Sequence, residues 1–342
     1  MALLDLYNSA NIKAYWDARK DDDTEYVGVD DLFGVEKQLD DTIESLAGKS
    51  GYTPTLLLNA ADSKTVYRGR GQITLEKHKI PYFKEGKQLD EKHIIELTKL
   101  EGNPNKALSK MIFERMFDDS YDLYKSSKMT REVMVQQLLS VGKIAFESNG
   151  AAFTATYSIT KETDLAGTAK WSDLTNSDPL KDIRKMKKDA KINGDARATC
   201  NSTTFDYLVN NAKIKNLLAN ARGVADISDK DILDLVYSRT GVRLYVNDNY
   251  YKADNGTDTP LFPDGIFTVF PQGQLGKIVF SVTPEERVLL GNPAAQVSIV
   301  DEGVAIVKTV ESDAVSIQAK VTMRCLPRLD IFPDQIVALK VA

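Results

Sequence analysis

The longest run of regularly spaced apolar residues lies between residues 103 and 149. Apolar side chains recur there every three or four positions, which is the spacing of one helix face; they include Leu108, Met111, Ile112, Met116, Tyr121, Tyr124, Met134, Val135, Leu138, Leu139 and Phe146. Asn103-Pro104 is a favourable helix start and Asn149-Gly150 a favourable helix end. A continuous helix of ~44 residues would be about 65 Å long, so we expect a break or a bend at Ser126-Ser127.

The region before this helix is less regular. Residues up to about Asn59 predict an arm with local structure, including a helix from Asp30 to Leu46. From Asn59 to Leu100, strand-like pieces alternate with glycine and proline turn signals. This segment predicts a long, charged β-hairpin.

The second half of the chain alternates helices and strands and then becomes mostly strand. Helices are expected after Asp178-Pro179, after Ser202, and after Ser228, which forms a capping-box pattern with Asp231. Expected strands are 153–159, 197–200, 242–246, 250–252, 266–270, 277–282, 296–300, 304–309, 316–325 and 336–341. Mixed elements in this order predict an α+β fold.

Composition and charge exclude several classes of protein. The chain has 342 residues, enough for one or two domains, and the 27% of charged residues is ordinary for a soluble protein. The net charge of −5 argues against a surface built broadly to hold nucleic acid. We expect no signal or transit peptide and no membrane helix. Cys200 and Cys325 are far apart in sequence and suit a reducing compartment.

Residues that commonly carry catalysis or bind metals are scarce. The two histidines, His78 and His93, lie far from both cysteines and outside any HExxH pattern. Zinc binding and a Ser-His-Asp triad are therefore not expected. The adjacent acids Glu285-Glu286 and Asp118-Asp119 should point in different directions. We expect no catalytic residue, no cofactor and no metal site.

Three charged segments invite a ligand interpretation. The glycines of Arg68-Gly69-Arg70-Gly71 lack the spacing of a phosphate-binding loop. The acidic runs 21–23 and 254–258 lack the ligand spacing of a calcium loop, so solvated turns are favoured. The cationic helix from Lys181 to Lys191 is either a solvated face, which is favoured, or a contact for nucleic acid.

The order of elements resembles the Hong Kong 97-type capsid fold, and details in the second half resemble the phage lambda major head protein family. The residues that carry the family resemblance are Lys170-Trp171-Ser172, Asp178-Pro179, Ile183, Cys200, Phe205, Leu208, Leu217-Leu218, Leu261 to Gly265, and the terminal segment Leu326 to Ala342. The match rests on order and spacing across nearly the whole chain, and is weakest in the N-terminal arm.

The resemblance implies an N-terminal arm (1–58), an extended loop (59–101), a spine helix with a peripheral domain (102–176), an axial domain (177–308) and return strands (309–342). It implies a major capsid protein without enzymatic activity that assembles into pentamers and hexamers of an icosahedral shell enclosing double-stranded DNA. Expected partners are a scaffold protein, a portal protein, a decoration protein, and DNA held by weak non-specific contacts. Assembly in the cytoplasm of a host bacterium and a final location in the virion follow.

The hairpin suggests where subunits meet. A two-stranded hairpin alone is marginally stable in water, so a neighbouring subunit is expected to supply contacts, with Arg68, Arg70, Lys77 and Lys79 meeting acidic groups there. No residue-level match supports a lysine–asparagine cross-link like those of some relatives. An encapsulin-like compartment and a two-domain enzyme that uses only carboxylates, lysine or tyrosine remain as alternatives, and the lambda-like ending argues against the encapsulin.

Overall fold

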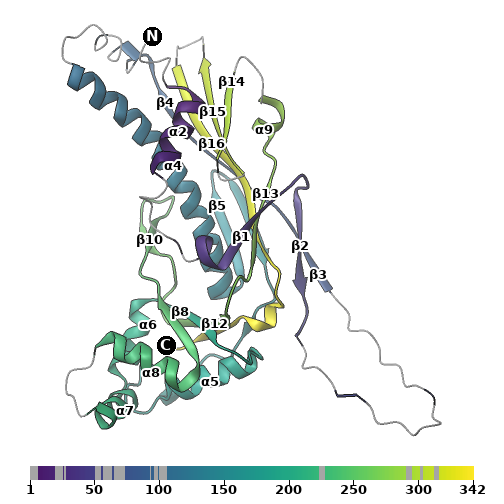
Figure 1. Ribbon diagram of the computed structural model, residues 1–342, viewed down its shortest axis with the longest axis vertical. Coiled ribbons are helices and arrows are strands. Elements are labelled where there is room, and N and C mark those ends of the chain that lie inside the picture. The colour runs from purple at the N-terminus through teal and green to yellow at the C-terminus, as the bar shows by residue number, and fades with distance from the viewer. Residues whose placement is uncertain are drawn as a thin grey trace. The chain divides into compact units, whose positions relative to one another are not determined.

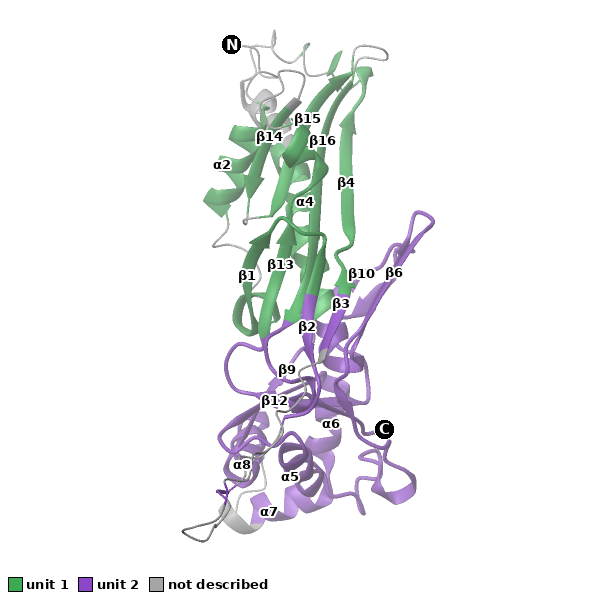
Figure 2. Cartoon of the chain, turned by 90° about the vertical axis from the view of Figure 1, so that its right-hand side faces the viewer, with its two compact units in different colours: residues 1–43, 78–135, 276–328 green, residues 44–77, 136–275, 329–342 purple. Residues whose placement is uncertain are grey.

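The structure is a computed structural model of the chain, and it describes residues 7–19, 26, 28–50, 55–56, 64, 74–92, 94–95, 99, 106–222, 228–289, 295–300, 303–311 and 316–342. The chain forms two compact units, which Figure 2 colours separately. Unit 1 contains residues 1–43, 78–135 and 276–328, and unit 2 contains residues 44–77, 136–275 and 329–342. Each unit is therefore built from segments that are distant in sequence.

Unit 1 is organised around a mixed sheet. Strand β1 pairs in parallel with β13, whereas β14, β15, β16 and β4 pair with one another in antiparallel fashion. The spatial order is β1 (Phe33–Gln38), β13 (Gly276–Ser281), β16 (Ser316–Leu329), β15 (Val304–Glu311) and β14 (Ala295–Val300), and β4 (Tyr82–Leu89) also pairs with β16. The central strands are buried, and the Phe280 side chain is packed so closely that a Cβ on Gly303 would lie 2.1 Å from its ring.

Aromatic packing and buried polar contacts hold the helical parts of unit 1. Helix α2 (Ser9–Arg19) stacks Trp16 on Tyr124 of α4 (Lys106–Val141), with ring centroids 5.1 Å apart. Fully burying such large side chains contributes roughly 1.5–3 kcal/mol each. The π-helical turn Gly28–Leu32 precedes β1, and α9 (Pro284–Leu289) follows β13.

Helix α4 is the longest helix of the described chain (Figure 1). The expected break at Ser126-Ser127 is wrong: the helix continues, and the two hydroxyls donate to the carbonyls of Asp122 and Tyr124. Hydrogen bonding back to the preceding turn lets serine remain inside a helix. The expected start at Asn103-Pro104 lies outside the described residues.

The helix ends at Val141, eight residues before the expected end at Asn149-Gly150. Asn149 and Gly150 instead form the turn between β5 (Lys143–Ser148) and β6 (Ala151–Thr156), with φ of 49° and 72°. Asn-Gly favours this turn because type I′ hairpin turns need positive φ at both central positions. The helix stops instead at Gly142, whose φ is +64°.

Unit 2 is a five-stranded sheet with helices packed against it. The order is β7 (Thr160–Lys161), β17 (Val337–Lys340), β12 (Ile266–Pro271), β8 (Ala196–Cys200) and β9 (Val242–Val246). Its helices are α5 (Pro179–Asp189), α6 (Ser202–Asn210), α7 (Ala212–Arg222) and α8 (Asp229–Thr240). Buried residues from these elements share one hydrophobic core with Trp171. Strands β10 (Tyr250–Lys252) and β11 (Asp258–Pro260) form a separate hairpin, and the short 3₁₀ turns Gly167–Ala169 and Pro333–Gln335 complete the unit.

Most local signals in unit 2 gave correct predictions. Asp178 caps α5, and Ser228 with Asp231 forms the predicted capping box of α8. Helix α6 is capped by Asn201 and not by Ser202, which is its first residue. The turn predicted at 254–258 lies between β10 and β11, except that Asp258 is already the first residue of β11. The α+β fold class is confirmed.

The predictions for residues 30–101 need correction. The helix expected from Asp30 to Leu46 is wrong, because β1 and β2 (Thr42–Ala47) occupy that segment. The expected pairing within 59–101 is also different: β3 (Thr74–Lys79) pairs with β2, and β4 pairs with β16. In both segments, pairing with strands from other parts of the sequence determines the structure. Within the described part of residues 30–101, the two-stranded hairpin is therefore β2–β3.

Candidate assembly surface

The β2–β3 hairpin presents one charged, exposed face. Along β2, Ile43, Ser45 and Ala47 are buried while Glu44 faces solvent. The Lys77 ammonium lies 2.6 Å from the Glu44 carboxylate, and both side chains are largely exposed. The hydrogen bond to Glu44 raises the pKa of Lys77 above its ordinary value. This ion pair links the two strands and leaves the face polar.

Of the four cations predicted to contact a neighbouring subunit, the structure describes two. Lys77 and Lys79 are exposed on β3, on the same face of the strand. Arg68 and Arg70 lie outside the described residues. Lys77 already has a partner within its own chain, which the sequence did not indicate. The contact of these four residues with a neighbouring subunit remains a prediction.

A polar cluster, which we call the Asp334 cluster, lies where the chain leaves β2. It consists of Ser50, Lys191 and Asp334, all from unit 2. The Ser50 backbone N–H and hydroxyl both donate to the Asp334 carboxylate at 2.9 Å. The Lys191 ammonium lies 3.0 Å from the same carboxylate and also donates to the Ser50 carbonyl. Sequence analysis missed this cluster because its members are 141 and 143 positions apart.

The cationic face of α5 is largely used inside unit 2. Arg184 donates to the Arg239 carbonyl, and Lys187 donates to the carbonyls of Thr240 and Gly241. Cations stabilise the C-terminal end of a helix, where carbonyls lack partners, so these residues bind α8. Lys185 pairs with Glu162 and Asp189. The helix therefore offers phosphate fewer cations than its sequence suggests.

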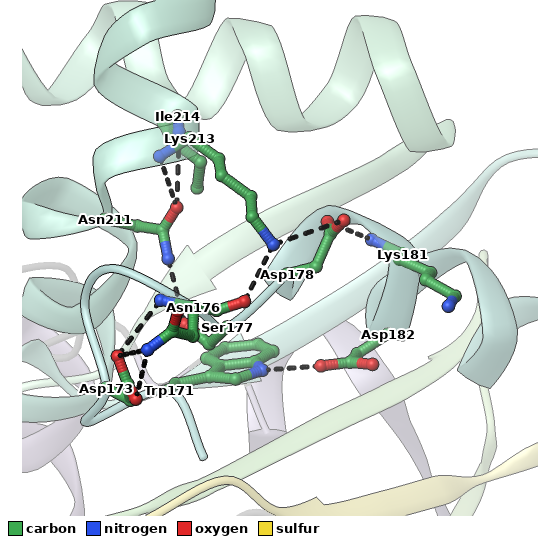
Figure 3. A network of polar contacts seen from close by, with 10 residues as sticks. All are labelled: Trp171, Asp173, Asn176, Ser177, Asp178, Lys181, Asp182, Asn211, Lys213 and Ile214. Carbon is green, nitrogen blue, oxygen red and sulfur yellow. Dashed lines mark hydrogen bonds and ion pairs between the residues drawn. The ribbon is translucent and has the colours of Figure 1, made fainter. Parts of the chain in front are cut away.

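The residues around Trp171 form a connected polar network (Figure 3). The buried Trp171 donates its indole N–H to Asp182 of α5 at 3.0 Å, and burial raises the pKa of that carboxyl. The Asp178 carboxylate accepts from the Lys181 N–H at the start of α5. Trp171 and Asp178 are among the residues that carry the family resemblance, and their contacts here fix α5 against the sheet.

The same network continues to α7 (Figure 3). Asn211 accepts from the N–H groups of Lys213 and Ile214 and donates to Ser177, and Lys213 donates to the Asn176 carbonyl. A pocket of about 370 Å³ lies beside it, lined by Asp178, Pro179, Leu180, Asn211, Lys213, Ile214, Asn216 and Leu217. Asp178, Asn211 and Lys213 are committed to structural hydrogen bonds, so the pocket offers no evident acid–base chemistry.

Residue types that commonly carry catalysis or bind metals are scarce in the described part of the chain. No cluster of three histidine, cysteine, aspartate or glutamate side chains is placed to hold a metal within those residues. Cys200 and Cys325 are buried, and burial raises the pKa of both thiols, that of Cys325 to about 12. His78 is half-buried, and His93 lies outside the described residues. No helix among the described elements is both long and apolar enough to cross a membrane.

The adjacent acids diverge as predicted. Glu285 accepts from the Tyr82 hydroxyl at 2.7 Å, whereas Glu286 pairs with Lys37. Desolvation opposes but does not outweigh the Tyr82 hydrogen bond and the nearby Lys320, so the pKa of Glu285 is lowered. Asp118 pairs with Arg19, and Asp119 pairs with Lys87. Neither pair of neighbouring carboxyls can share a proton.

Comparisons with known proteins identify the family. The family model of phage major capsid protein E matches residues 25–327. A candidate capsid protein of a prophage in E. coli CFT073 is similar in structure, with a TM-score of 0.55, 15% identity and coverage of 79% of this chain and 80% of that one. A phage-related protein from Bordetella bronchiseptica RB50 has a TM-score of 0.54, 13% identity and coverage of 96% of both chains. No curated protein matches the chain.

At these identities the structural neighbours show the fold, and the family match covers most of the sequence. The expected Hong Kong 97-type capsid fold is therefore confirmed, and the protein is a structural component and not an enzyme. The chain belongs to the phage major capsid protein E family and is a shell-forming component of the virion.

Proposed function

We propose that the chain assembles through pentamers and hexamers into an icosahedral shell around double-stranded DNA, and that its β2–β3 hairpin lies across a neighbouring subunit. The observation that supports this most directly is the two-stranded β2–β3 sheet with its exposed Glu44–Lys77 pair. Two strands alone are marginally stable in water, so contacts from a second copy would stabilise the hairpin. Arg68, Arg70, Lys77 and Lys79 then meet carboxylates of that copy.

The other proposed partners follow from the family. A scaffold protein, a portal protein and a decoration protein take part in assembly, which occurs in the cytoplasm of the host bacterium. The net charge of −5 supports weak, non-specific contact with packaged DNA, since tight phosphate binding requires an excess of cations. The internal use of Arg184, Lys185 and Lys187 supports the same conclusion.

Electron microscopy tests assembly itself. The protein is expressed alone and together with its scaffold gene, and both preparations are examined by negative stain. We expect closed shells or uniform capsomer rings in at least one of them. Monodisperse monomers or dimers in both preparations would contradict the proposal.

Charge variants test the hairpin contact. The quadruple reversal R68E/R70E/K77E/K79E should abolish shells but leave a folded subunit, because like charges would then face each other across the interface. The matched control R68K/R70K/K77R/K79R keeps every charge and should form shells. A normal yield of shells from the reversal variant would show that these four residues make no essential contact.

A further inference from the structure

The Asp334 cluster joins three segments of unit 2. Ser50 lies three positions after the end of β2. Asp334 lies in the 3₁₀ turn Pro333–Gln335, which directly precedes β17 of the five-stranded sheet. Lys191 lies just beyond the C-terminal end of α5. The cluster thus connects the chain leaving β2 to both the sheet and a helix of unit 2.

The carboxylate of Asp334 is almost buried and accepts several hydrogen bonds within this cluster. It accepts from the Ser50 N–H, the Ser50 hydroxyl and the Lys191 ammonium, and the residue is 8% exposed. Hydrogen bonds to a charged acceptor are stronger than neutral ones, and their strength increases away from water. The position of Ser50 is therefore held by several bonds at once.

The backbone at Lys191 gives independent evidence that its side chain is needed. Lys191 has a φ of 56°, and the N–H of Ile192 reaches the Lys187 carbonyl, as in the motif that ends many helices. Glycine is preferred at this position because a Cβ is strained in the left-handed region. A lysine here carries a conformational cost that glycine would avoid. Its contacts with Ser50 and Asp334 supply a reason for that choice.

We propose that Lys191 and Asp334 are positioning residues for shell assembly. By holding Ser50 against unit 2, they fix the point and direction from which the connection between β2 and β3 begins. This inference rests on the proposed function of the β2–β3 hairpin, which contacts a neighbouring subunit. When the connection begins from one fixed point, the hairpin presents its charged face to the neighbour at one angle, and one angle gives shells of one size.

The substitution Lys191→Gly separates this role from folding. Glycine relieves the strained local backbone, which offsets the loss of the charged contacts, so the unfolding midpoint of the unassembled subunit should change little. Loss of the charged contacts should speed hydrogen exchange at the Ser50 amide by about tenfold or more. Shells of one diameter should be lost, either to mixed diameters or to open assemblies. Asp334→Asn, which keeps an oxygen acceptor and removes the charge, should act in the same direction with a smaller effect.

Lys185→Ala is the matched control, since it removes a lysine of the adjoining helix α5 that pairs with Glu162 and Asp189 and not with Ser50. It should leave both Ser50 exchange and shell size unchanged. Unchanged Ser50 exchange in Lys191→Gly, or uniform shells despite faster exchange, would overturn the positioning role. If the quadruple charge reversal of the hairpin also forms normal shells, the proposed hairpin contact itself fails. If only the reversal prevents assembly, the contact stands and the positioning role falls.

Discussion

The helix starts of unit 2 and the segment that contains β1 in unit 1 are held in place by different means. In unit 2, polar side chains cap helices within three residues of their own position: Asp178 at α5, Asn201 at α6, Asn211 at α7 and Ser228 at α8. In unit 1, carboxylates reach across the sequence. Glu132 of α4 accepts from backbone groups 104 and 103 positions away, and Glu36 of β1 binds Arg328, 292 positions away.

This difference has a physical consequence. A cap satisfies orphan N–H groups at one helix end, so its loss weakens that helix first. A long-range carboxylate ties a segment to a part of the chain that is distant in sequence, so its loss loosens that segment from the rest of the unit. In unit 1 the segment from Gly28 to Gln38 depends on such contacts, because β1 is an edge strand of its sheet. Changes to carboxylates should therefore destabilise unit 1 more than changes to caps destabilise unit 2.

The strongest test of this difference is Glu132→Ala. The buried carboxylate accepts from the N–H groups of Gly28 at 3.2 Å and Val29 at 2.9 Å, and both donors would lose their partner. We expect the free energy of unfolding to fall by roughly 2–4 kcal/mol, the cost of two unsatisfied buried donors that had bonded to a charge. Urea unfolding of the unassembled subunit measures this loss.

A control and a local readout sharpen that result. Glu132→Gln keeps one oxygen acceptor and should lose less stability than the alanine variant. Hydrogen exchange should become faster in peptides covering residues 28–38 and stay unchanged in α5. A loss for Glu132→Ala within about 0.5 kcal/mol of zero, the usual range of surface substitutions, would show that this contact does not hold the segment.

The same difference explains which parts of the fold were predictable. Asp178-Pro179 and the Ser228–Asp231 capping box act within one turn, so their sequence pattern contains the whole interaction. The Asn149-Gly150 signal is also local, but it fits both a helix end and a hairpin turn. Asn149 and Gly150 form the hairpin turn because β5 and β6 pair on either side of them.

The segment from Asp30 to Leu46 shows where sequence patterns fail. Its strand β1 exists because it pairs with β13, about 240 positions further on. The Asp334 cluster was equally unpredictable, because Ser50, Lys191 and Asp334 are brought together only by the fold. The unusual lysine in the left-handed region could not be noticed either, because the cationic helix was expected to include Lys191, whereas α5 ends at Asp189.

Acid should reveal the contribution of the second long-range carboxylate, Glu36. Its two oxygens each lie 3.0 Å from Arg328, and Lys277 donates at 2.8 Å. The hydrogen bonds from Arg328, and then those from Lys277, lower the pKa of Glu36 from 4.5 to about 2. A carboxyl with a lowered folded pKa stabilises fully above pH 4.5, and this contribution is lost as the pH falls toward 2.

We expect this contribution to be about 1 kcal/mol after allowance for solvent screening, because the side chain is 32% exposed. Urea unfolding measured at several pH values between 5 and 2 should show a shallower loss of stability in Glu36→Gln than in the unchanged protein. Equal slopes in the two proteins would mean that Arg328 and Lys277 do not depend on the Glu36 charge. The Glu36 contribution would then be smaller than that of a single cap in unit 2.

The smallest expected effect is that of a cap in unit 2, Asp178→Ala. Asp178 accepts from the Lys181 N–H at 3.2 Å, and its side chain is 47% exposed. The loss of this cap should therefore lower stability by about 0.5 kcal/mol, the low end of the range for N-caps. Asp178→Asn keeps the acceptor and should recover most of that loss. Faster hydrogen exchange should be confined to the first turn of α5, in contrast to Glu132→Ala. If exchange also rises around Trp171, the cap is coupled to the network of Figure 3. The distinction between local caps in unit 2 and long-range carboxylates in unit 1 would then no longer apply at this helix.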